Sequence, residues 1–151
     1  MRAEQLAVPV MAPMEVRFRL QADAGSVRDG MKRILATEPL LSMSDDDRGN
    51  AQIVLAEVLN NVVEHAHAAG SGPILLVLSL AEGFLHCRVE DEGTPMPGGE
   101  LPGGHALDPA DLPEGGFGWH LIRLLCHDLR YERIGGRNCL GFSLPAERSG
   151  G

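Results

Sequence analysis

Residues 92 to 116 constrain the fold of this chain more than any other segment, because five prolines and seven glycines interrupt it. Proline lacks a backbone N–H and glycine has no side chain to pack, so neither a helix nor a central strand can run through such a stretch. A connection this long inside a compact domain is usually functional or disordered. Regular structure is therefore expected on either side of it.

The apolar pattern predicts strands where hydrophobic residues alternate with polar ones or run continuously between turn residues. Ala81-Glu82-Gly83 and Gly135-Gly136 would each close a hairpin. The predicted strands cover residues 15–20, 73–80, 84–91, 129–134 and 138–144.

Three helices are predicted from cap residues and helical spacing. Ser26 and Asp29 form a capping-box pattern that opens a short helix through about residue 37. Ser44 caps a longer helix through about residue 67, and Asp45 to Asp47 lie at the positive end of its dipole. A short amphipathic helix follows at 117–128. One arc of the long helix is apolar at three- and four-residue spacing: Ala51, Val54, Leu55, Val58, Val62 and Ala66.

The order of these elements predicts an α+β fold, a two-layer α/β sandwich whose mixed, mostly antiparallel sheet carries its helices on one face. A length of 151 residues suits one domain. That domain is expected at 15–145, with a lid at about 92–116. Flexible segments are expected at 1–14 and 146–151.

Composition excludes several classes of partner. The formal net charge of −8 would repel phosphate backbones and anionic lipid, so neither nucleic acid nor a membrane is an expected partner. No segment approaches the roughly 20 apolar residues that span a bilayer. Cys87, Cys126 and Cys139 make an odd count without CxxC spacing, which favours free thiols in a reducing compartment. A cytoplasmic location is expected.

Glu57 and Asn61 lie four residues apart on the long helix, so their side chains are stacked one turn from each other at the border of the apolar arc. An amide oxygen from Asn61 is a suitable ligand for Mg²⁺, and the Glu57 carboxylate can orient and deprotonate an attacking hydroxyl. A solvated helix face explains the same pair. The chemical interpretation therefore needs support from elsewhere in the chain.

Two glycine-containing turns supply that support. Asp91 ends an apolar strand and precedes Glu92-Gly93, where a carboxylate can accept a hydrogen bond from the exocyclic amine of adenine and glycine allows close approach of a base. Gly115-Gly116-Phe117-Gly118 leads directly into the last predicted helix, whose free N–H groups suit phosphate oxygens. The intervening segment is expected to close over the nucleotide as a lid.

The set of motifs, in this order, resembles the GHKL (histidine-kinase-like) ATPase superfamily over about residues 15 to 145. Within it, the chain looks most similar to the anti-sigma-factor serine kinases. The motifs that carry this similarity are ExxxNxxxH (Glu57, Asn61, His65), Asp91-Glu92-Gly93, Gly116-x-Gly118 and the closing 136–140 hairpin.

The resemblance implies that Glu57 is the catalytic base, that Asn61 is the Mg²⁺ ligand and that Asp91 recognises adenine. It implies ATP or ADP with Mg²⁺ as cofactors. Further nucleotide contacts are implied at His65, Gly93, Gly115, Gly116 and Gly118.

The implied function is an anti-sigma regulatory factor and serine kinase that phosphorylates a STAS-domain antagonist and takes part in partner switching. Its partners would be that antagonist and a sigma factor or other regulatory protein, with a homodimer expected through the outer surface of the sheet or the N-terminal arm. Two departures matter. Thr94-Pro95 stands where the superfamily often has a second glycine, and Glu114 stands where a basic residue often holds the terminal phosphate. Glu114 favours the alternative, a nucleotide-dependent binding module that sequesters a partner without catalysis.

Other features have simpler interpretations. His65-Ala66-His67 lacks a third ligand and is expected to be exposed, not a metal site. Phe117 and Trp119 are expected to pack the lid helix rather than stack on a base.

Overall fold

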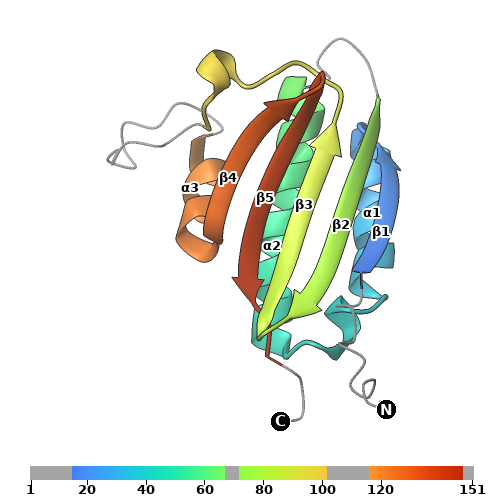
Figure 1. Cartoon of the computed structure of the whole chain (residues 1–151). Helices are drawn as coiled ribbons and strands as arrows, with labels where there is room; N and C mark the ends of the chain where they lie inside the picture. The colour runs from blue at the N-terminus through green and yellow to red at the C-terminus, as the bar shows by residue number, and fades with distance from the viewer. Residues whose placement is uncertain (1–14, 67–71, 102–115, 148–151) are drawn as a thin grey trace, which may run out of the picture.

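The computed structural model describes residues 15–66, 72–101 and 116–147 of the chain, which form two layers, a sheet and a set of helices (Figure 1). The sheet has five strands in the order β1-β2-β3-β5-β4. Its strands are β1 Glu15–Gln21, β2 Pro73–Ala81, β3 Phe84–Asp91, β4 His127–Ile134 and β5 Arg137–Pro145. All four pairings of these strands are antiparallel. The sequence predicts a mixed, mostly antiparallel sheet, and the described strands include no parallel pair. The predicted two-layer α+β fold is confirmed.

Two-residue turns close both hairpins. Glu82 and Gly83 have positive φ angles of 55° and 81°, and Gly135 and Gly136 have φ angles of 56° and 79°. Positive φ at both central positions gives the turn a twist that matches the flanking strands. The first turn is one residue shorter than the sequence predicts, because Ala81 still pairs with Phe84 across the hairpin.

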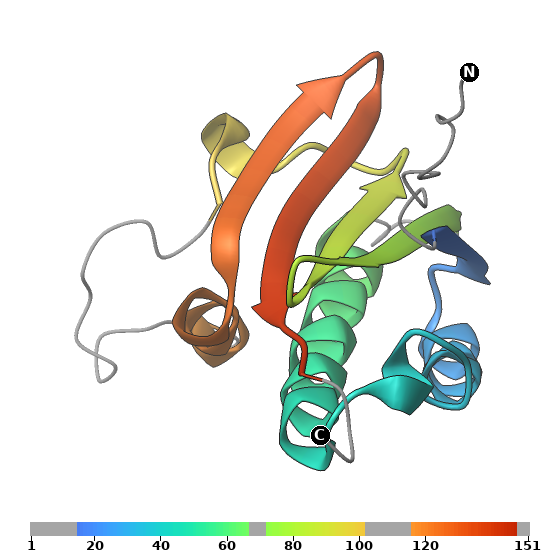
Figure 2. The ribbon, with the colours of Figure 1, turned by 60° about the horizontal axis from the view of Figure 1, so that its bottom comes forward.

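Three α-helices cover one face of the sheet, as Figure 2 shows. They are α1 Ala24–Leu35, α2 Asp45–Asn61 and α3 Gly116–Leu125. The cap predicted for α1 is wrong: Asp23 is the N-cap, and its Oδ1 accepts a hydrogen bond from the Ser26 N–H at 2.8 Å. The backbone of Asp23 is extended, which allows its side chain to reach back over the first turn.

The cap predicted for α2 is confirmed. The Asp47 N–H donates to Ser44 Oγ at 3.2 Å. Asp47 also ties the far end of the chain to this helix, because its Oδ2 accepts from the Glu147 N–H at 2.7 Å, while the Ser44 N–H donates to the Glu147 carbonyl at 2.8 Å. The acidic first turn therefore stabilises the N-terminus of α2, and its hydrogen bonds hold the residues that follow β5 beside the helix.

α2 ends sooner than its pattern predicts. After Asn61 the chain continues as a π-helical turn, η2 Val62–Ala66, and two short 3₁₀ turns lie elsewhere at η1 Leu40–Ser42 and η3 Pro97–Gly99. A π turn holds more residues than an α turn, so it changes the direction in which the following side chains point, and such turns occur often at functional sites. Here it begins directly after Asn61.

The last helix is also shorter than predicted. α3 ends at Leu125, and His127, which the sequence assigns to the helix, begins β4. The β4–β5 register is irregular between His127 and Arg130, and Asp128 has a positive φ of 53°. Such a bulge interrupts the two-residue alternation by which a strand is recognised. The helical spacing of the preceding residues therefore predicts a helix that continues past its actual end at Leu125.

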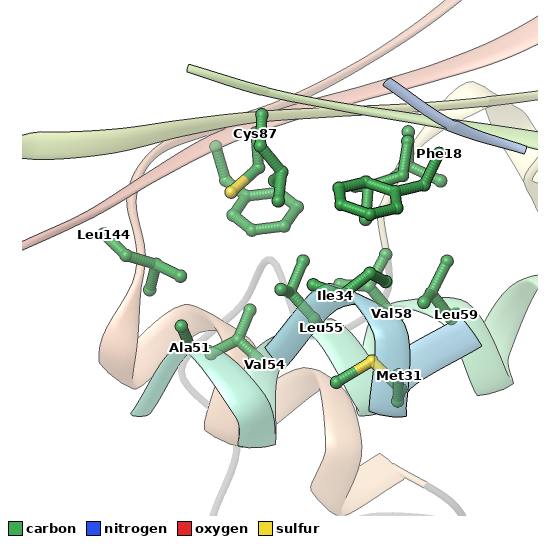
Figure 3. Close-up of a cluster of buried hydrophobic side chains, with 14 of the residues drawn as sticks. Phe18, Met31, Ile34, Ala51, Val54, Leu55, Val58, Leu59, Cys87 and Leu144 are labelled. Atoms are coloured by element: carbon green, nitrogen blue, oxygen red, sulfur yellow. The ribbon is translucent and has the colours of Figure 1, made fainter. Parts of the chain in front are cut away.

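The hydrophobic core fills the space between the sheet and the helices (Figure 3). α2 lies at its centre with Val54, Leu55 and Leu59 fully buried. Trp119 and Ile122 of α3 are buried in the same core, so the predicted packing role of Trp119 is confirmed. Residues contributed by the sheet and by α1 include Phe18, Cys87, Leu144, Met31 and Ile34. This packing fixes which side of α2 faces α3.

None of the helices in the described ranges has the length and apolar character needed to cross a membrane.

Candidate functional site

α2 and α3 approach each other closely where Gly118 faces Glu57 and Asn61. A Cβ placed on Gly118 would lie 2.5 Å from Glu57 Oε2 and 3.9 Å from Asn61 Nδ2. The two polar side chains of α2 therefore meet at one point, next to the first turn of α3. Only glycine leaves room for the carboxylate there. Three of the predicted site residues are thus brought together by the fold.

Asn61 carries a polar group that the described part of the chain leaves unpaired. Its side chain is 8% exposed, and its Nδ2 is buried without a hydrogen-bond partner among the described residues. A buried polar atom without a partner costs about 1–3 kcal/mol, and folded proteins contain few of them. An unpaired polar atom next to Gly118, where the missing side chain leaves space, is typical of a site in which a bound ligand supplies the hydrogen-bond partner.

The same position suits a metal bound together with a nucleotide. Rotation of the amide would present Asn61 Oδ1, an oxygen ligand of the type that Mg²⁺ prefers. Within the described part of the chain, His, Cys, Asp and Glu residues form no cluster of three or more that could hold a metal. Mg²⁺ commonly takes one or two protein ligands and completes its shell with phosphate and water. The residues present therefore fit Mg²⁺ carried by a polyphosphate.

Asp91 is the last residue of β3 and points to the helix-covered face of the sheet, in alternation with Cys87 and Val89. It is 5% exposed. Its Oδ1 accepts hydrogen bonds from the Gly93 N–H at 2.8 Å and from Asn138 Nδ2 at 3.0 Å. A buried carboxylate needs such donors, which hold it in one orientation.

Asp91 lies toward the same end of the molecule as the α2 residues. β3 and α2 run in the same direction and end at the same edge of the sheet (Figure 1). Glu57 and Asn61 occupy the last two turns of α2, and Asp91 closes β3 on the face that α2 covers. Side chains from separate parts of the chain thus lie around one end of the two layers.

Asn138 of β5 is a site residue that the sequence analysis does not single out. It is directly opposite Asp91 in the sheet register and is 6% exposed. Its Nδ2 also donates to the Thr94 carbonyl at 2.9 Å, while its Oδ1 accepts from the Tyr131 hydroxyl and from Arg133 Nη1. The only sequence signal for it is its place in the hairpin that resembles the family.

The other predicted residues have varied surroundings. Gly116 begins α3, and Gly93 follows Asp91 as expected. The His65 side chain is exposed, with Nε2 3.8 Å from Glu64 Oε2, and its contact with a nucleotide stays a prediction. Gly115, Glu114 and residues 102–115 of the lid lie outside the described residues, as does His67.

The three cysteines are free thiols, as the sequence predicts. Burial raises the pKa of Cys87 well above its usual value and that of Cys126 to about 12. Both thiols therefore stay protonated near neutral pH.

The fold and the site together define a histidine kinase-like ATPase domain. The model of that family, described as the histidine kinase-like ATPase domain, matches residues 16–144, and the chain belongs to this family.

Serine kinases are among its relatives. Serine-protein kinase RsbW of Bacillus thuringiensis (strain Al Hakam) and that of Bacillus cereus (strain 03BB102) are each 32% identical to this chain over 92 residues. Each alignment covers 56% of this chain and 56% of the relative, so the chain spans about half the length of the curated relatives it matches. The resemblance inferred from the sequence is confirmed.

A solved structure shares the fold. The RsbU and RsbW domains of Rv1364c from Mycobacterium tuberculosis match with a TM-score of 0.61 and 16% sequence identity, over 90% of this chain and 33% of that one.

Proposed function

We propose that the chain binds ATP with Mg²⁺ among α2, α3 and the end of β3, and transfers the γ-phosphoryl group to a serine of a STAS-domain antagonist protein. The observation that carries this proposal is the meeting of Glu57 and Asn61 at Gly118, with a buried Asn61 amide that has no partner in the described structure. Similarity to serine-protein kinases supports the choice of acceptor.

The nucleotide contacts follow from the chemistry of each group. Asp91 accepts a hydrogen bond from the 6-amino group of adenine, and Gly93 lets the base approach the backbone. The N-terminus of α3, at Gly116 and Gly118, presents N–H groups to phosphate oxygens. His65 and Gly115 complete the proposed contacts.

Glu57 acts as the general base in this proposal. Its carboxylate takes the proton of the serine hydroxyl while the serine oxygen bonds to the γ-phosphorus, and ADP leaves with the electrons of the broken P–O bond. Asn61 would hold Mg²⁺, which when bound would supply positive charge against the phosphate oxygens. The half-buried position of Glu57 beside Gly118 limits the directions in which its carboxylate can point.

Partner switching is the proposed biological role. The chain would hold a sigma factor or another regulatory protein until a STAS-domain antagonist displaces it, and phosphorylation of the antagonist would reverse that exchange. A homodimer is proposed through the face of the sheet opposite the helices, which the described helices leave open (Figure 2).

Calorimetry with ATP, with and without Mg²⁺, followed by detection of phosphoserine on an added STAS-domain protein, tests the proposal. Magnesium-dependent ATP affinity together with phosphoserine supports it. ATP affinity without phosphoserine on any STAS-domain protein that binds would favour the alternative, a nucleotide-dependent module that sequesters its partner. Absence of ATP affinity would exclude both.

The Gly118→Ala variant is expected to fold normally and to phosphorylate its substrate at least about tenfold more slowly, because small misplacements of catalytic groups have large effects. The added methyl group would lie 2.5 Å from Glu57 Oε2, and the carboxylate must move away from it. The side chain is flexible, so the helix itself is undisturbed and alanine favours it. Thermal unfolding and the initial rate of phosphoserine formation measure the two effects.

Gly49→Ala provides the matched control. Gly49 lies in the same helix as Glu57, and no atom lies within 4 Å of the position of its added Cβ. This variant should be more stable by about 1 kcal/mol and fully active. An equal loss of activity in both variants would show that the rate does not depend on the space beside Glu57.

A further inference from the structure

A chain of hydrogen bonds connects the β4 strand to Asp91 through Asn138. Asp91, Asn138 and Arg133 are successive partners across β3, β5 and β4 in the sheet register. The Arg133 guanidinium can only donate, so it fixes the acceptor side of the Asn138 amide, Oδ1, at 3.0 Å from Nη1. The amide nitrogen must then face Asp91, whose Oδ1 it meets at 3.0 Å.

Tyr131 reinforces the same orientation and connects it to the start of the lid. Its hydroxyl donates to Asn138 Oδ1 and accepts from the Met96 N–H at 3.0 Å. Arg133 Nη1 also donates to the Gly93 carbonyl at 2.7 Å. Two side chains of β4 therefore hold both the strand-end carboxylate and the backbone that follows it, residues 93–96.

We propose that Tyr131 and Arg133 are positioning residues for adenine recognition, acting through the Asn138 amide on the Asp91 carboxylate. This inference rests on the proposed nucleotide site. When either donor is lost, Asn138 Oδ1 keeps only one of its two hydrogen bonds, so the amide is held less firmly and its Nδ2, which also donates to the Thr94 carbonyl, orients the carboxylate less well. Asp91 would then lose the orientation in which it meets the 6-amino group of adenine, while the phosphate contacts at α3 would be unchanged.

The test compares ATP with purine riboside triphosphate, which lacks only the 6-amino group, in calorimetric titrations with Mg²⁺. The variants are Tyr131→Phe, which removes one oxygen atom, and Arg133→Met. In both, the affinity for ATP should fall by about threefold to tenfold, the loss expected for weakening one hydrogen bond, and the affinity for purine riboside triphosphate should stay the same. The preference for ATP therefore decreases by that factor.

Arg130→Met is the matched control, since it removes the same charge from the same strand. The Arg130 guanidinium lies over Gly141, the β5 residue opposite it, and donates to the Asp128 carbonyl, away from the Asn138 network. Its preference for ATP should equal that of the wild type.

The outcomes are distinguishable. Two results would overturn the positioning role and leave the proposed function standing, provided that the wild type binds ATP. One is an equal fall in affinity for both nucleotides in Tyr131→Phe and Arg133→Met. The other is a preference for ATP in these variants that equals that of the wild type. A wild type without affinity for ATP would overturn both. If the preference for ATP fell in Arg130→Met as much as in the other two variants, the loss of positive charge would explain the effect, and the role of the Asn138 network would be overturned.

Discussion

The Glu57→Gln variant is expected to bind ATP with nearly the affinity of the wild type and to phosphorylate its substrate about 10²- to 10⁴-fold more slowly, the range by which a positioned general base accelerates a reaction. Glutamine has the same shape and fills the same space against Gly118, but it cannot accept the serine proton. Calorimetry measures the ATP affinity, and mass spectrometry of the STAS-domain substrate measures phosphoserine formation.

Asp46→Asn is the control for the loss of one carboxylate from α2. Asp46 lies in the first turn of the helix, is exposed, and is far along the helix from Glu57. Its activity should match the wild type. If Glu57→Gln transferred phosphate as fast as Asp46→Asn, the proton would have another acceptor, and Glu57 would serve only to bind.

Much of the fold could be predicted because its signals are local. Alternation, cap residues and paired turn residues each involve a few neighbouring positions, and they located the strands and most helix starts. The errors have local causes as well. Asp23 and Ser26 are both good cap residues, and only the extended backbone at Asp23 decides between them. The irregular start of β4 interrupts the pattern of a strand at His127.

The candidate site was predictable only in part. Glu57, Asn61 and Asp91 carry recognisable chemistry at recognisable places, whereas the close contact of Gly118 with Glu57 depends on how α3 packs on α2. The Asn138 network was missed for the same kind of reason. Its members lie on three strands, and Asn138 is 47 residues from Asp91, so only the sheet register brings them together.

The Asp91→Asn variant is expected to fold and to lose about 10- to 100-fold in ATP affinity, the range for a hydrogen bond to a charged group. The new side chain has the same shape, and its single oxygen can still accept from the Gly93 N–H and Asn138 Nδ2, which keeps these two hydrogen bonds. Its amide nitrogen then replaces the second carboxylate oxygen. In the proposed site a donor would face the donor amine of adenine, an arrangement without a hydrogen bond.

Glu90→Gln is the control, because Glu90 precedes Asp91 on β3 and points to the opposite face of the sheet. There it pairs with Arg88 at 2.7 Å and Arg137 at 3.3 Å, apart from the Asn138 network. Titrations with ATP and ADP should give wild-type affinities for Glu90→Gln and weakened ones for Asp91→Asn. Equal affinities in the two variants would place adenine away from the end of β3, since a carboxylate that touches the base cannot be exchanged for an amide without effect.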